Sequence, residues 1–134
     1  MDELPEDLTG LVEKLDKAYV ATASEGGVPH IAIERGLSVD QGDLVFDSWF
    51  CPKTAANLGE NPSVVVALWY EEEGKGYQLE GEKSSLREVA TLDGYPTEAD
   101  REKYPQTEYR LRINVQEVYR FSPGPHSDRP KMGL

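Results

Sequence analysis

The segment from residue 44 to residue 70 reads LVFDSWFCPKTAANLGENPSVVVALWY, and it holds three patterns in succession. The apolar run 44–46 predicts a strand, and the longer run 64–70 predicts a buried strand. Between them, Pro52–Leu58 predicts a short helix, because proline suits the first helical position, where its missing N–H would have no partner. This part of the chain therefore predicts a strand, a helix and a strand in close succession.

The first turn of the predicted helix carries a cation and a hydroxyl. The Gly59–Pro62 segment is expected to end the helix, and Lys53 and Thr54 fall at its start. That turn offers free backbone N–H groups and the positive end of the helix dipole, which disfavours a lysine unless an anion lies beside it. Lys53 is also the only basic residue between Arg35 and Lys75. These features are typical of a phosphate site.

Length and charge narrow the classes of partner. The chain has 134 residues, enough for one domain with one sizeable core. It carries 14 basic and 25 acidic residues, so nucleic acids and anionic membranes are poor partners. The sequence contains no run of eighteen apolar residues, and the N-terminus is acidic, so we expect neither a membrane span nor a signal peptide. The expected compartment is the cytoplasm.

Metal sites and the common catalytic motifs are not predicted. One cysteine and two histidines are too few for an intrachain disulfide, a thiolate-rich zinc site or a three-histidine site. The G-x-G-x-x-G, Walker A, G-x-S-x-G and H-E-x-x-H patterns are all missing from the sequence. A nucleophile pair of Cys51 and His30 stays open, although a cysteine that is buried or next to a helix is usually inert. The one feature in favour of the pair is the helix N-terminus beside Cys51, since such a position is able to lower a thiol pKa. We therefore name no catalytic residue and no metal ligand.

The other patterns predict a mainly β chain. Six strands are expected, at residues 18–23, 28–39, 44–48, 64–71, 77–86 and 109–121. Hairpin turns are expected at 24–27 and 40–43, a polar turn at 72–76 and a bulge in the last strand. Two further short helices are expected at 8–15 and 97–104. Such a series favours an antiparallel barrel over a fold of parallel strands and crossover helices.

Several short motifs occur in an order that resembles one known family. They are an Ala-Thr pair in the first strand, Gly26-Gly27, Pro29-His30, Asp43–Phe46, Lys53–Leu58, Asn61-Pro62-x-Val64 and Tyr77-x-x-x-Gly81. Together they resemble the FMN-binding split-barrel family, also called pyridoxamine 5'-phosphate oxidase-like, and its small stand-alone FMN-binding proteins in particular. The resemblance implies a six-stranded antiparallel split β-barrel of the Greek-key type with a few short helices. The length predicts a single domain over residues 1–134, and the Pro- and Gly-rich composition predicts an irregular tail from about residue 122.

The resemblance also implies a cofactor and a partner. In that family FMN lies, bound non-covalently, in a groove at the interface of a homodimer. The residues implied to contact FMN are Lys53, Thr54 and Asn57 at the phosphate, His30, Ile31, Ala32 and Ile33 along the ring, and Asp47, Ser48 and Trp49 at a strand end. A helix N-terminus, an ammonium group and a hydroxyl suit a phosphate dianion on physical grounds as well.

Other interpretations of these residues stay open. Thr54 can serve only as a helix-start residue, and Asn57 can brace the helix instead of touching a ligand. Trp49 and Phe50 can belong to the core or to a dimer interface. Arg35 can pair with an acidic neighbour or reach the flavin.

The chain departs from the family's oxidases in two places. Those enzymes place two adjacent basic residues at the phosphate turn, and here Pro52 precedes Lys53. The tail at 126–131 does not match their C-terminal basic motif, so the sequence argues against pyridoxamine 5'-phosphate oxidase activity. We expect an oxidoreductase that moves hydride or electrons through FMN. An electron carrier, a deazaflavin- or haem-binding protein, and a module that has lost its ligand are the alternatives.

Overall fold

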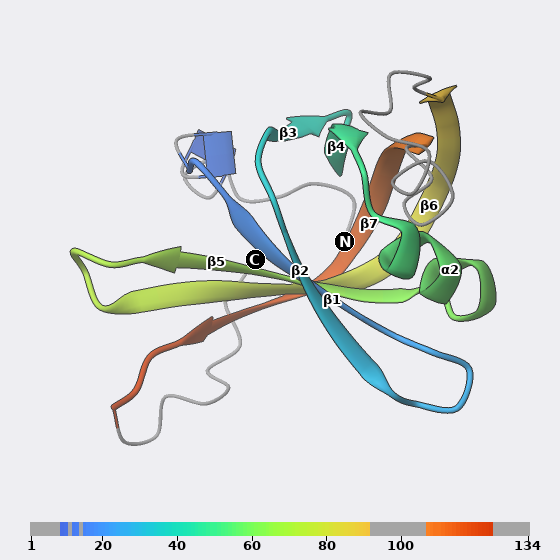
Figure 1. Cartoon of the computed structure of the whole chain (residues 1–134). Helices are drawn as coiled ribbons and strands as arrows, with labels where there is room; N and C mark the ends of the chain where they lie inside the picture. The colour runs from blue at the N-terminus through green and yellow to red at the C-terminus, as the bar shows by residue number, and fades with distance from the viewer. Residues whose placement is uncertain (1–8, 11, 14, 92–106, 125–134) are drawn as a thin grey trace, which may run out of the picture.

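The computed structural model describes residues 9–10, 12–13, 15–91 and 107–124 (Figure 1). They include the helix α2 (Pro52–Glu60) and one antiparallel sheet of seven strands. The strands are β1 (Ala18–Ala23), β2 (Pro29–Glu34), β3 (Leu37–Asp40), β4 (Asp43–Trp49), β5 (Ser63–Tyr70), β6 (Lys75–Thr91) and β7 (Thr107–Phe121). Residues 9, 10, 12 and 13 are also helical, whereas the helix predicted at 97–104 lies outside the described residues.

The strands lie in the order β2-β1-β5-β6-β7-β4-β3, so β2 and β3 form the two edges. These edge strands are consecutive in the chain, and the sheet curls into a barrel that stays split between them (Figure 1). The prediction of a mainly β, antiparallel split barrel is confirmed, but the count of six strands is wrong. The stretch expected as one strand at 28–39 breaks at Gly36, whose φ of 78° lies in the left-handed region that glycine adopts without steric cost.

The helix begins as predicted and ends later. Pro52 lies in its first turn, but the helix continues through Gly59 to Glu60, so Gly59 does not stop it. Asn61 ends it in an extended conformation, and the Asn61 N–H still bonds to the carbonyl of Asn57. The cause is Pro62, because a residue that precedes proline is pushed out of the helical region.

The bulge predicted in the last strand is confirmed. Glu80 pairs with Glu117 and Gly81 pairs with Val115, which leaves Gln116 as the extra residue of β7. The bulge lets Val115 and Val118 both point into the core, where at most 1 % of either residue is exposed.

The core fills the barrel and reaches under α2. The largest of its fully buried side chains are Phe46, Leu44, Leu58, Leu68, Leu79, Leu111 and Ile113. Leu58 comes from α2, which contacts β1, β2 and β6. Among the described residues, we find no helix with the length and apolar character needed to cross a membrane.

Two glycines give opposite expectations for substitution by alanine. At Gly81 a Cβ would overlap the backbone carbonyl oxygen of Asn114, which cannot move without breaking the β6–β7 ladder. At Gly59, on the exposed side of α2, the Cβ would meet nothing within 4 Å. We expect Gly81→Ala to lower the free energy of unfolding by about 1–3 kcal/mol or more. Gly59→Ala should raise it by about 0.5–1 kcal/mol. Urea denaturation measures both, and a Gly81→Ala protein as stable as the wild type would contradict the described ladder.

Candidate functional site

The N-terminus of α2 has donor groups to offer to an anion. Cys51 is the N-cap, and within the described part of the chain no side chain caps this end. The first intrahelical bond runs from the Ala55 N–H to the Cys51 carbonyl at 2.8 Å, so the N–H groups of Lys53 and Thr54 precede it. The first turn also contains no acidic residue among those described. The positive end of the helix dipole is therefore not neutralised by the chain.

Thr54 adds a buried hydroxyl to this helix end. The residue is 1 % exposed, and its Oγ1 has no hydrogen-bond partner among the described residues. Leaving a buried polar atom without a partner costs about 1–3 kcal/mol, so such an atom calls for a partner, which a water molecule, an ion or a ligand can supply. Lys53, the next residue toward the N-terminus, is exposed, and its ammonium group is able to reach an anion held at this end.

Asn57 lies one turn after Thr54 on the same buried face of α2. It is 2 % exposed, and its Nδ2 donates a hydrogen bond to Thr22 Oγ1 on β1 at 3.1 Å. The amide thus has the bracing role considered from the sequence, and its contact with FMN stays a prediction. Thr22 was missed by the sequence analysis, because a threonine in an apolar strand gives no sign of a partner 35 residues away.

The β2 segment His30–Ile33 runs along the edge of the sheet beside β1. Ile31 and Ile33 point outward and are 69 % and 53 % exposed, whereas His30 and Ala32 are half-buried. In the described structure β2 pairs with β1 alone, so its other edge keeps free backbone donors and acceptors. The structure therefore brings the predicted ring strand to the same region as α2, which contacts both β1 and β2.

The predicted contacts at the end of β4 point in different directions. Asp47 and Ser48 are exposed, and Asp47 forms an ion pair with Arg110 of β7 at 3.3 Å. Trp49 is 5 % exposed and packs against Phe46 with ring centroids 5.1 Å apart. The position of Trp49 fits the core interpretation, and its contact with FMN stays a prediction.

Cys51 does not have the activated thiol that its position beside a helix suggested. Burial raises its pKa to about 12, and the negative charge of Glu34 adds to the effect. Its Sγ lies 3.9 Å from the Trp49 carbonyl oxygen. Glu34, at the end of β2, is itself half-buried, and burial raises the pKa of its carboxyl, while a bond from the Arg35 N–H opposes the shift. The helix N-terminus therefore does not activate this thiol, and the inert interpretation of Cys51 fits its burial.

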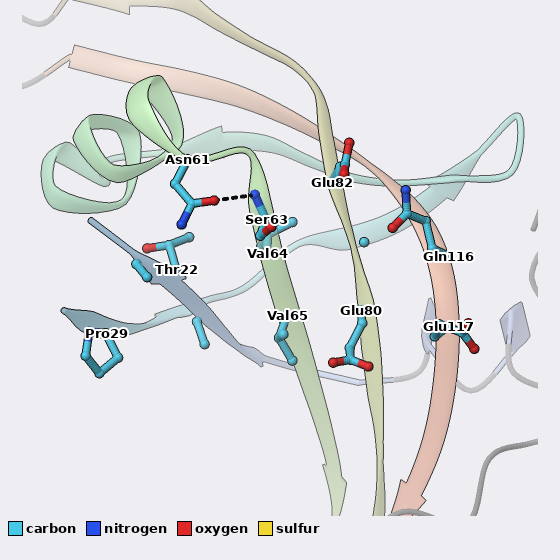
Figure 2. Close-up of a pocket in the computed structure, with 13 residues that line it drawn as sticks. Thr22, Pro29, Asn61, Ser63, Val64, Val65, Glu80, Glu82, Gln116 and Glu117 are labelled. Carbon is cyan, nitrogen blue, oxygen red and sulfur yellow. Dashed lines mark hydrogen bonds between the residues drawn. The ribbon is translucent and has the colours of Figure 1, made fainter. Parts of the chain in front are cut away.

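A hollow of about 450 Å³ lies beyond the C-terminal end of α2 (Figure 2). Its polar lining is mostly acidic and amide, and includes Asn61, Ser63, Glu80, Glu82, Gln116 and Glu117. Figure 2 shows Asn61 turned toward Ser63, whose N–H bonds to the Asn61 side chain at 3.1 Å. Across the parts of the chain that the structure describes, no group of three His, Cys, Asp or Glu residues is placed to hold a metal ion.

The comparisons with known proteins identify the family. A family model described as pyridoxamine 5'-phosphate oxidase matches residues 4–122, so the chain belongs to this family. This confirms the family expected from the sequence. The chain is also 27 % identical over 139 residues to the uncharacterised protein MJ0282 of Methanocaldococcus jannaschii, covering 95 % of this chain and 87 % of that one.

Solved structures show the same fold at low sequence identity. HupZ of Group A Streptococcus matches with a TM-score of 0.68 and 16 % identity over 97 % of this chain and 99 % of its own. General Stress Protein 26 of Bacillus anthracis matches with a TM-score of 0.62 and 18 % identity, over 96 % of this chain and 97 % of its own. Two further solved structures carry names that mention different cofactors.

One is an F420 reductase, with a TM-score of 0.62 and 16 % identity, over 86 % of this chain and 98 % of its own. The other is HutZ, the haem storage protein of Vibrio cholerae, with a TM-score of 0.54 and 15 % identity. This match covers 87 % of this chain and 94 % of HutZ.

The raised pKa of Cys51 predicts slow alkylation. An unfolded cysteine ionises near a pKa of about 8.5, whereas the folded thiol ionises at about 12. At pH 8 iodoacetamide should label the native protein far more slowly than the same protein in urea, as mass spectrometry would show. Because the folded pKa is the higher one, this thiol's contribution to stability is full below the unfolded pKa and is lost as pH rises toward 12. A Cys51→Ala variant should lose that part of the alkaline decline, and rapid native labelling at pH 8 would contradict the buried thiol.

Proposed function

We propose that this protein binds FMN non-covalently, with the phosphate at the N-terminus of α2. The buried hydroxyl of Thr54, without a partner in the described structure, carries this proposal. It lies beside the Lys53 and Thr54 N–H groups, which precede the first intrahelical bond. A phosphate has enough acceptor oxygens for all of these donors and for the Lys53 ammonium group.

The strand β2 supports the position of the flavin ring. Ile31 and Ile33 offer an exposed apolar face, and the free edge of the strand offers backbone groups for the polar side of a ring. When bound, FMN supplies hydride and electron transfer, and the chain supplies position and electrostatics. We propose oxidoreductase or electron-transfer activity and no acid or base from the chain. The reaction of the family's oxidases is not proposed, because Pro52 stands at the second basic position.

A homodimer is part of the same proposal. Val28, Ile31 and Ile33 are 64 %, 69 % and 53 % exposed on an edge strand and the turn before it. Exposed apolar side chains in such numbers on an open sheet edge favour an interface. A second copy packed here would also cover the side of the ring that one chain leaves open to water.

The named relatives supply two rival cofactors. F420 carries a flavin-like ring and a phosphate on a ribityl chain, so the α2 site fits it in the same way. Haem lacks a phosphate and would leave the Thr54 hydroxyl without its partner. The donors at α2 therefore favour a phosphorylated flavin over haem, and the titration below includes all three ligands.

Lys53→Ala should weaken FMN binding by about 1–3 kcal/mol, the range for a lost charge-assisted hydrogen bond. Fluorescence titration of protein stripped of flavin measures it, with F420 and haem as parallel ligands. Lys75→Ala is the matched control, since Lys75 is an exposed lysine that pairs only loosely with Glu73 at 3.9 Å. If the wild-type protein binds F420 or haem but not FMN, the proposal that FMN is the cofactor is contradicted. If Lys53→Ala and the wild type bind FMN with equal affinity, the proposed position of the phosphate at α2 is contradicted.

Ile31→Glu should convert the dimer into a monomer, because a carboxylate would be buried without a partner in the proposed interface. Light scattering after gel filtration gives the mass directly. Val89→Glu serves as the control, since Val89 on β6 is also exposed, at 39 %, but lies on a different strand from the proposed interface. A wild-type protein that is monomeric at micromolar concentration would overturn this part of the proposal.

A further inference from the structure

Buried polar side chains gather at one place in this protein. Among the described residues, those that are both polar and buried are Thr22, Thr54 and Asn57, and all three lie where α2 meets β1. A buried polar group is costly unless it is bonded, so apolar residues would give a more stable contact here. Thr54 has its place in the proposed phosphate site. Thr22 and Asn57 bond to each other and are still to be explained.

Thr22 connects the two halves of the proposed FMN site. Its hydroxyl accepts the 3.1 Å bond from Asn57 Nδ2 on α2. Its backbone pairs directly with His30, in the first part of β2. Asn57 in turn lies one turn from Thr54 on the same face of the helix. One residue therefore joins the strand proposed to carry the ring to the helix proposed to carry the phosphate.

A second polar contact holds the other half of α2. Lys83 on β6 donates from Nζ to the Leu58 carbonyl at 2.8 Å, and its own N–H bonds to the Pro62 carbonyl at 2.9 Å. Apolar packing of Leu58 alone would let the helix turn or slide, because dispersion contacts have no preferred direction. Hydrogen bonds of defined length fix its axis while its N-terminus keeps its donors free.

We propose that the Thr22–Asn57 hydrogen bond positions α2 and thereby sets the distance between flavin ring and phosphate. By holding α2 in place, the pair favours the phosphorylated flavin over riboflavin. This inference rests on the proposed function, since it gives the phosphate site its geometry. Thr22 and Asn57 are positioning residues in this account, and Thr54 and Lys53 make the contacts.

The experiment compares FMN and riboflavin affinity in each variant. Thr22→Val removes the bond and leaves the Asn57 amide buried without a partner, so FMN affinity should fall about tenfold or more, the loss expected from a displaced charged contact. Riboflavin affinity should stay within about twofold, because riboflavin does not use the helix. Thr22→Ser keeps the hydroxyl and should keep the preference for FMN.

A double variant separates positioning from stability. In Thr22→Val/Asn57→Leu both partners are apolar, so the melting temperature should recover toward the wild-type value. The preference for FMN should remain lost, because no bond fixes α2. If the preference returns with the stability, the pair is merely structural and the inference is overturned.

Thr54→Val provides the opposite pattern. It removes a hydroxyl that has no partner among the described residues, so the ligand-free protein should melt at a higher temperature while its FMN preference falls. If the wild-type protein binds FMN and riboflavin with equal affinity, the proposed phosphate site itself is disproved. If the double variant prefers FMN over riboflavin as strongly as the wild type does, only the positioning role of the Thr22–Asn57 pair is disproved.

Discussion

Only Arg35 and Gly36 join β2 to β3, although these strands form the two edges of the described sheet. Three virtual bonds between consecutive Cα atoms span roughly 11 Å at most. The sheet therefore has to curl until its edges come close, and the barrel follows from this short link. The curl also sets the place of α2. The helix connects β4, next to one edge, to β5, two strands from the other.

Local patterns predicted much of this fold. The apolar runs around residues 52–60, the proline at the helix start and the turns at 24–27 and 40–43 each depend on neighbours in sequence. The break at Gly36 was not predicted, because a glycine inside a strand-like stretch has several uses, a bulge or a close backbone approach among them. The pairing of Thr22 with Asn57 depends on the sheet order, which no local pattern contains. The raised pKa of Cys51 depends in the same way on burial and on Glu34, a residue of another strand.

The candidate site shows the same division. Its helix end was predicted from residue types alone, since a lysine, a threonine and a proline after a strand have a direct physical meaning. The direction of each side chain was not predicted. Trp49 turns into the core, whereas its neighbours Asp47 and Ser48 face solvent. A fold built around a split edge leaves strand backbone and apolar side chains exposed at β2. Such an open edge is a liability in an isolated chain, because unpaired backbone groups can pair with another chain.

The bulge at Gln116 lets β7 tolerate both the replacement and the loss of one residue. Gln116 is exposed, so its replacement by another polar residue has little to disturb. Its deletion would leave Val115 opposite Gly81 and keep Glu117 and Val118 opposite Glu80 and Leu79, so both valines would still point into the core. A deletion in the regularly paired part of β7 would instead turn the side chains on one side of it to the opposite face.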